Sequence, residues 1–107
     1  MTEDELLTGI TDALTLGGWR WWHIRRSDRA LLMGHRGWPD VTAVKAGRLL
    51  LLEAKTARGL VENDQWEWLG RLRSAGIDAR VVRPADYDAL VAELTGDRLL
   101  AVAGRRT

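Results

Sequence analysis

The stretch Gly37–Lys55, GWPDVTAVKAGRLLLLEAK, decides the fold of this 107-residue chain. It contains two apolar runs, 41–44 and 49–52, which a short break over 45–48 separates. A glycine in a short polar break between two apolar runs is typical of a β-hairpin turn. The sequence therefore predicts two antiparallel strands that a turn at Ala46-Gly47 connects.

The register of this hairpin brings two acidic residues together. With the turn at Ala46 and Gly47, Asp40 lies directly opposite Glu53; a four-residue loop gives the same register, whereas a three-residue loop would shift it. Side chains directly opposite share one face of the sheet, and like charges there are destabilising. Lys55, two residues beyond Glu53, points to the same face. A divalent cation between the two carboxylates explains an arrangement that folding alone does not.

Each of these residues also has an ordinary structural interpretation. Asp40 is compatible with a turn acid, Glu53 and Lys55 with a cross-strand ion pair, and Gln65 with a polar group at a helix N-terminus. Taken singly, each structural interpretation is as good as the functional one. Taken together, in one register on one face, the residues favour a functional site.

This arrangement resembles the PD-(D/E)XK nuclease superfamily, whose signature is Pro-Asp, a β-hairpin and then acid-x-Lys. It is most similar to the VRR-NUC branch, in which Gly-x-Pro-Asp is followed by Glu-x-Lys, a Gly, and a Gln that opens the next helix. The likeness extends from the N-terminal helix to about residue 94. The matching residues are Gly37, Pro39, Asp40, Glu53, Lys55, Gly59 and Gln65.

The resemblance implies a restriction-endonuclease-like α/β fold. Such a fold has a helix, then a mixed β-sheet whose central hairpin carries the site, then helix, strand and helix. The residues are consistent with one domain over 1–107, in which 98–107 form an extra strand or a tail, and 99–103 a strand or a dimer arm.

The resemblance also implies roles for individual residues. Carboxylates are hard oxygen ligands that suit Mg²⁺ or Mn²⁺, so Asp40 and Glu53 are the expected metal ligands. The backbone carbonyl of Ala54 is a further candidate ligand. Glu3, on the inward face of the first helix, is another, although it is also compatible with a first-turn acid that complements the helix dipole. The expected catalytic residues are Asp40, Glu53, Lys55, Gln65 and Glu3.

Composition limits the remaining function classes. The chain has no cysteine, which excludes disulfides and thiolate metal sites. It has no apolar run of membrane-spanning length, and its acidic start is not a signal peptide, so we expect a cytoplasmic protein without membrane partners. The net charge of +1 gives no global attraction to nucleic acid.

Arginine use is more informative than net charge. Of the 16 cationic residues only Lys45 and Lys55 are lysine. The guanidinium fork suits phosphate, but a GC-rich genome would produce the same bias. The expected DNA-binding residues are Arg25, Arg26, Arg29, Arg36 and Arg58.

The other elements follow from caps and periodicity. We expect a helix over 2–16, with Thr2 as N-cap and Glu5 completing a capping box. We then expect four further elements: a strand over 19–26, a helix over 63–75 that Asn63 caps, a strand over 79–83 and a helix over 84–94. The six tryptophans, in a chain without phenylalanine, are expected mainly to fill core positions, and base stacking is the alternative.

The predicted function is a Mg²⁺-dependent, structure-selective DNA endonuclease. Stand-alone small VRR-NUC proteins resemble Holliday-junction resolvases that act as dimers, and many are encoded by phages. The resemblance therefore favours a homodimer that cuts four-way junctions in DNA repair or recombination, in a bacterial or phage-infected cell. The alternatives are a flap, nicking or restriction-like nuclease, and a non-catalytic junction-binding protein.

Overall fold

The computed structural model describes residues 1–24 and 33–104, and its side chains as far as residue 96. Within that part of the chain, no helix combines the length and the apolar character that a membrane span requires. The elements, in order, are α1 (Glu3–Leu16), β1 (Arg20–His23), β2 (Val41–Lys45), β3 (Arg48–Ala54), α2 (Asn63–Ser74), β4 (Asp78–Val82), the 3-10 turn η1 (Pro84–Asp86) and α3 (Tyr87–Gly104).

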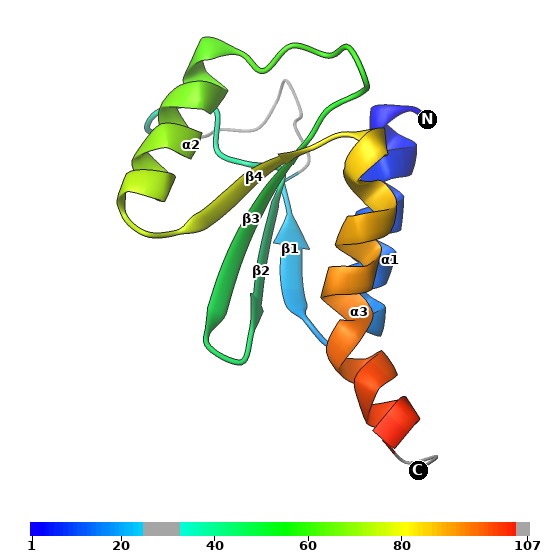
Figure 1. Cartoon of the computed structure of the whole chain (residues 1–107). Coiled ribbons are helices and arrows are strands. Elements are labelled where there is room, and N and C mark those ends of the chain that lie inside the picture. The colour runs from blue at the N-terminus through cyan, green and yellow to red at the C-terminus, as the bar shows by residue number, and fades with distance from the viewer. Residues whose placement is uncertain (25–32, 105–107) are drawn as a thin grey trace.

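The four strands form one mixed sheet in the order β1-β2-β3-β4. β2 pairs antiparallel with β1 and β3, and β4 runs parallel to β3. Helices α1 and α3 lie together on one face of the sheet, and α2 covers part of the other (Figure 1). The predicted α/β fold, with the hairpin at the centre of the sheet, is confirmed.

The hairpin has the predicted turn and register. Ala46 and Gly47 have φ values of 47° and 79°, the two positive values that a tight type I′ turn requires. Val41 pairs with Leu52, so the next position along brings Asp40 to the level of Glu53. Alternation along β3 directs Leu50, Leu52 and Ala54 toward α1 and α3, and Leu51 toward α2.

The N-terminal cap of α1 is confirmed. The Glu5 N–H donates to Thr2 Oγ1 at 3.1 Å, and the Thr2 N–H donates to Glu5 Oε1 at 3.2 Å. These two bonds form the capping box that the sequence predicts. The hydrogen bonds from Thr2 hold the pKa of Glu5 below its ordinary value.

Two predictions about helix ends are wrong. The N-cap of α2 is Glu62 rather than Asn63. The Glu62 N–H donates to Gln65 Oε1 at 2.9 Å, so the side chain of Gln65 satisfies the backbone donor of the cap residue. Of the alternatives for 99–103, the strand is wrong, because these residues are part of α3, which continues to Gly104. A single glycine such as Gly96 weakens a helix by only about 1 kcal/mol, and the leucines and alanines that follow are strong helix formers.

The tryptophans are less buried than expected. Trp19 does lie in the core, 6% exposed, and its Nε1–H donates to the Leu94 carbonyl at 3.0 Å. Trp21, Trp22 and Trp66, in contrast, are 37%, 56% and 49% exposed. The expectation of a tryptophan-rich core is therefore wrong for these three, because aliphatic side chains, mainly leucines, fill the core instead.

Gly37 lets α2 approach the segment that precedes β2. Its φ is +100°, and a Cβ at this position would lie 2.5 Å from the carbonyl carbon and oxygen of Asp64, in the first turn of α2. A Cβ contact under 3.0 Å forces a neighbour to move, and here the neighbour is helix backbone. Glycine is therefore required at position 37 for α2 to dock where it does.

Gly37→Ala is expected to destabilise the protein more than Gly34→Ala. Both glycines have nearly the same φ, +100° and +101°, but a Cβ at Gly34 would meet nothing within 4 Å. Both variants gain backbone strain, of roughly 1–3 kcal/mol. Gly37→Ala adds an overpacking cost of about 1–3 kcal/mol. Urea denaturation measures the difference, and equal losses of unfolding free energy in the two variants would contradict this account of α2 docking.

An ion-pair network connects α3 to the sheet. Arg80 donates two hydrogen bonds to Asp78, both at 2.8 Å, and two to Glu93, both at 2.9 Å. Arg48 donates to Glu93 at 3.2 Å. The hydrogen bonds from Arg80 are the main reason that the pKa values of Asp78 and Glu93 are lowered, and the two carboxylates in turn raise the pKa of Arg80.

This network should stabilise the protein at neutral pH and lose its effect in acid. Because the pKa of Glu93 is lowered on folding, its contribution is fully present above the ordinary value of 4.5 and is lost as pH falls through the lower folded value. Glu93→Gln should reduce the unfolding free energy at pH 7 by up to about 1 kcal/mol, a small amount because the side chain is partly exposed.

The measurement is thermal unfolding of wild type and variant from pH 7 to pH 3. The gap between the two should close as Glu93 becomes protonated in the folded protein. Glu67→Gln, in the exposed pair with Arg71, is the control and should change the unfolding free energy by about 0.5 kcal/mol at most. A gap for Glu93→Gln that stays constant down to pH 3 would exclude the network as its source.

Candidate active site

Residues at the ends of β1 and β3 hold Asp40, which directly precedes β2. The Asp40 side chain is 6% exposed, and its Oδ2 accepts a hydrogen bond from the Ala54 N–H at 2.9 Å. Its backbone carbonyl accepts from the Ile24 N–H at 3.2 Å and lies 2.8 Å from His23 Nδ1. Asp40 is therefore held against the strand end that carries Glu53 and Lys55.

Glu53 and Gln65 meet where α2 begins. They are 1% and 2% exposed, and Gln65 Nε2 donates to Glu53 Oε1 at 3.2 Å. The other end of the same amide accepts the Glu62 N–H, as the helix cap. This double role fixes the orientation of the Gln65 amide and directs its NH₂ group at Glu53. Gln65 thus contacts one of the two hairpin acids, and its catalytic role stays a prediction.

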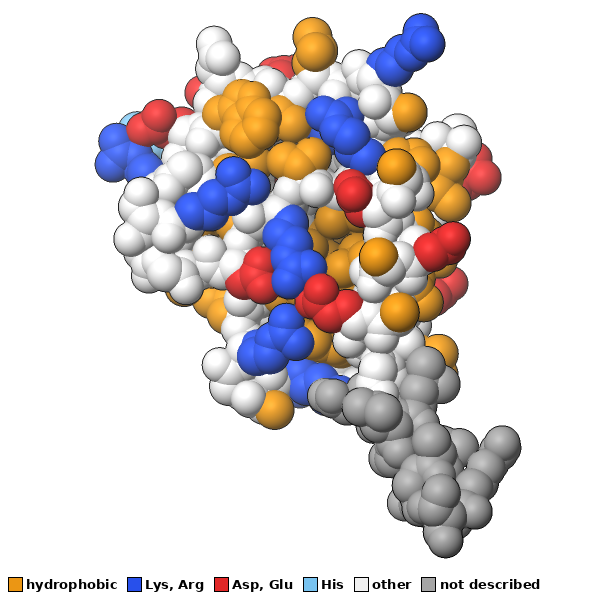
Figure 2. Space-filling model, in the orientation of Figure 1, with side chains coloured by type: hydrophobic (Ala, Val, Ile, Leu, Met, Phe, Trp, Pro, Cys, Tyr) orange, Lys and Arg blue, Asp and Glu red, His pale blue; other side chains and the backbone are white. Residues whose placement is uncertain are grey.

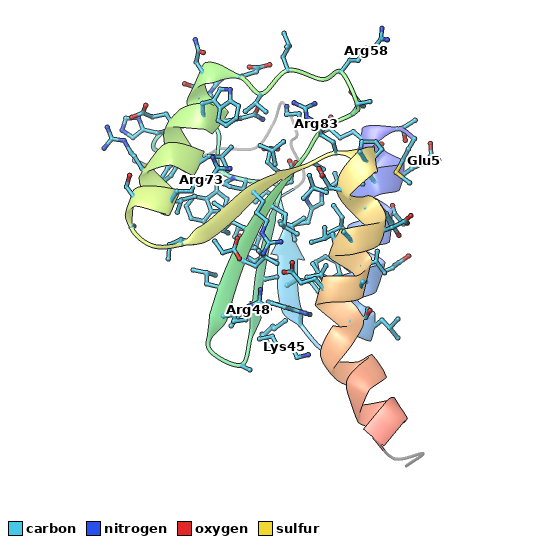
Figure 3. The ribbon with its side chains drawn as sticks, viewed as in Figure 1. Glu5, Lys45, Arg48, Arg58, Arg73 and Arg83 are labelled. Atoms are coloured by element: carbon cyan, nitrogen blue, oxygen red, sulfur yellow. The ribbon has the colours of Figure 1, made fainter. Side chains whose placement is uncertain are left out.

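Lys55 lies at the end of β3, where β4 holds its backbone. Its N–H donates to the Val82 carbonyl at 2.9 Å, and the residue is 9% exposed. Arg83, the residue that follows β4, donates from Nη1 to the carbonyls of Thr56 and Gly59, both at 2.8 Å (Figure 3). Arg83 thus fixes the turn that follows Lys55. Sequence reasoning missed it, because backbone carbonyl partners leave no pattern in the sequence.

Glu3 lies on a cleft that Asp40 also reaches. This cleft, of about 540 Å³, lies between α1 and β1. Within the described residues, no group of three or more His, Cys, Asp or Glu side chains is arranged to hold a metal ion. Glu3 is therefore near the predicted site but does not form a three-carboxylate ligand set with Asp40 and Glu53, and its role as a metal ligand stays a prediction.

The two hairpin carboxylates fit a hydrated divalent cation. Magnesium is often bound by only one or two protein carboxylates and keeps several waters for the remaining positions. Burying carboxylates costs several kcal/mol per ion unless an opposite charge compensates. Asp40 and Glu53, both buried, supply oxygen donors of the type that Mg²⁺ or Mn²⁺ requires.

The structure places only part of the predicted DNA-binding set. Arg25, Arg26 and Arg29 fall outside the described residues. Arg36 and Arg58 are exposed, and Arg58 points away from the body on the loop after β3 (Figure 3). The face in Figure 2 mixes Lys and Arg side chains with Asp and Glu. Phosphate binding by these arginines stays a prediction.

Sequence reasoning missed two residues of β1 that line the cleft beside Asp40. Trp21 and His23 both do so, and His23 pairs with Val41, the first residue of β2. A long connection separates β1 from β2, so no turn in the sequence fixes their register. The only available signal was the two-residue spacing of Trp21 and His23, which places them on one face of a strand.

Comparison with known proteins supports the fold. No family profile matches the sequence, and no curated protein matches it. A solved structure described as a VRR_NUC domain is similar over 85% of this chain and 95% of its own length, with a TM-score of 0.67 and 18% sequence identity. A Holliday junction resolvase, Hjc, of the archaeal hyperthermophile Archaeoglobus fulgidus matches over 77% of this chain and 64% of its own, with a TM-score of 0.47 and 22% identity. The chain has the fold of the VRR-NUC nuclease domain.

Proposed function

We propose that this protein is a metal-dependent DNA endonuclease. The observation that supports the proposal is the burial of Asp40, Glu53 and Lys55 around one end of the central hairpin, with Gln65 of α2 bonded to Glu53; all four are at most 9% exposed. Burial of two acids and a lysine at one strand end is costly for stability, so a chemical role is the better explanation. The VRR-NUC fold supports the same conclusion.

The residues divide the chemistry of phosphodiester hydrolysis among them. Asp40 and Glu53 would hold Mg²⁺ or Mn²⁺, with the Ala54 carbonyl and Glu3 as further candidate ligands. When bound, such an ion would lower the pKa of a coordinated water and neutralise negative charge on the phosphate. The Lys55 ammonium orients the attacking water or stabilises the negative charge that develops on the phosphate. Gln65 positions the Glu53 carboxylate through its amide.

The preferred substrate is a four-way DNA junction, which a homodimer would cut. A two-fold dimer presents two sites to the symmetry-related strands of a junction. It also doubles the number of arginines that can bind phosphate. This matters because a net charge of +1 gives the single chain little overall attraction to DNA. The setting would be the cytoplasm of a bacterial or phage-infected cell. A flap or nicking nuclease and a non-catalytic junction-binding protein are the alternatives.

Asp40→Asn and Glu53→Gln should each reduce Mg²⁺-dependent cleavage at least about 100-fold, because each removes one anionic ligand. Both changes keep the shape of the side chain, and the amide that replaces the Asp40 carboxylate retains an oxygen that can accept the Ala54 N–H. The protein should therefore stay folded. The measurement is cleavage of labelled DNA with Mg²⁺, with unfolding curves for each variant and Asp12→Asn, on the exposed face of α1, as control. Metal-dependent cleavage by Asp40→Asn at the wild-type rate would refute the mechanism.

Oligomeric state and substrate preference test the resolvase proposal. Light scattering at micromolar concentration should show a dimer, and cleavage should be faster on four-way junctions than on single flaps or duplex. Binding should weaken steeply as salt rises, because phosphate contacts release counterions. A strict monomer that cuts flaps faster than junctions would exclude the resolvase and leave the general nuclease assignment intact.

A further inference from the structure

The cleft between α1 and β1 is large enough for a small ligand. Its volume of about 540 Å³ lies within the roughly 300–1,000 Å³ of small-molecule sites. The two elements that form its walls contact each other and lie side by side (Figure 1). Asp40 reaches the cleft from its position before β2. A ligand in the cleft would therefore be next to Asp40.

The cleft has a mixed acidic, hydroxyl and apolar lining. Its lining includes the carboxylates of Glu3, Asp4 and Asp40, and no lysine or arginine among the described residues. Two of these carboxylates, Asp40 and Glu3, are candidate metal ligands, so a bound cation would offset their charge. Leu7 and Ile24 add apolar surface. The lining residues other than the carboxylates therefore suit a ligand with an apolar body and polar edges, which is the character of a nucleobase.

Trp21 gives the cleft an aromatic wall. Its side chain is 37% exposed and lines the cleft, while its Nε1–H donates to Thr15 Oγ1 at 2.9 Å. This hydrogen bond fixes one edge of the indole to α1, so little side-chain freedom is lost when a ring stacks on it. Stacking of a base on an aromatic side chain is sequence-tolerant, because every base has a π-face.

The α1 wall supplies polar groups for the edge of a base. Thr8 and Thr11 both line the cleft, and the Thr11 hydroxyl donates to the Thr8 carbonyl at 3.1 Å. With its proton used in this way, the Thr11 oxygen still has lone pairs that accept from an amino group. The aromatic wall and the hydroxyl groups thus come from the two different elements that form the cleft.

We propose that the cleft between α1 and β1 binds one unpaired nucleobase of the DNA substrate, next to the scissile phosphate, by stacking on Trp21. This inference rests on the proposed nuclease function and narrows its substrate to DNA that offers an unpaired base beside the cleavage position, as at the opened branch point of a four-way junction or at a flap. A fully paired duplex cannot fill the cleft without the energetic cost of unstacking a base.

The first test compares Trp21→Ala with Trp22→Ala. The two tryptophans are neighbours on β1, but Trp22 points to the opposite face and is 56% exposed. Binding of a fluorescent flap substrate is measured by anisotropy without divalent metal. Trp21→Ala should weaken binding about tenfold, the usual effect of losing one stacked base. Trp22→Ala should change it less than about twofold, since its side chain lies outside the cleft.

A conservative variant guards against misfolding. Trp21→Phe keeps an aromatic face and should retain most of the binding, even if Trp21→Ala unfolds. Equal losses for Trp21→Ala and Trp22→Ala, or equal losses for Trp21→Phe and Trp21→Ala in folded protein, would overturn the proposal.

The second test moves a single abasic nucleotide along the unpaired strand. At one position the abasic substrate should weaken wild-type binding about tenfold. At that position the abasic nucleotide should not weaken binding by Trp21→Ala any further, because the base and the indole form a single contact that is already lost. Additive losses at every position would overturn the proposal.

Cleavage of the same substrates with Mg²⁺ tests the nuclease function separately from the base-binding site. Wild-type cleavage without coupling between Trp21 and any base would remove the subsite and leave the nuclease function. Coupling without cleavage would keep the base-binding site and remove the nuclease function.

Discussion

The burial of two carboxylates at one end of the β2–β3 hairpin is the constraint on which this structure depends. Asp40 and Glu53 are 6% and 1% exposed and lie at the same level of the two strands. Like charges in that position repel, and removing each from water costs several kcal/mol. The Ala54 N–H and the Gln65 amide offset part of this cost. A divalent cation would add the opposite charge that two carboxylates attract. The register is equally constrained, because a slip of one residue would move the acid of the slipped strand to the opposite face.

The surrounding elements each position one part of this hairpin end. Helix α2 brings Gln65 to Glu53, and it can approach closely only because Gly37 has no Cβ. Strand β4 holds the backbone of Lys55, and Arg83, which follows β4, fixes the turn after it. Helix α1 forms the far wall of the cleft that reaches Asp40. Each layer of the fold therefore contributes residues to the site or to the cleft beside it. This explains how a chain of 107 residues can carry a candidate active site.

The hairpin and its acids could be predicted from sequence because the rules that govern them are local. A two-residue turn with Gly47 fixes the register, and the register fixes which side chains face each other. The cap of α1 is equally local, since Thr2 and Glu5 are only one helical turn apart. Features that depend on tertiary contacts could not be predicted. The pairing of β1 with β2 spans a long connection, so the place of His23 beside Asp40 was not foreseen. The exposure of three tryptophans likewise depends on how the layers pack. The Glu62 cap and the extension of α3 to Gly104 are local features, which sequence reasoning nevertheless assigned incorrectly.

The most direct test of this account is a crystal structure of the protein with Mn²⁺, in which anomalous scattering locates the ion. We expect an anomalous peak between the carboxylates of Asp40 and Glu53, with the Ala54 carbonyl beside it. The same crystals of Asp40→Asn should show a much weaker peak. Well-diffracting crystals of the wild type with no Mn²⁺ at this position, or with the ion bound only elsewhere, would contradict the claim that the buried carboxylates of the hairpin form a metal site.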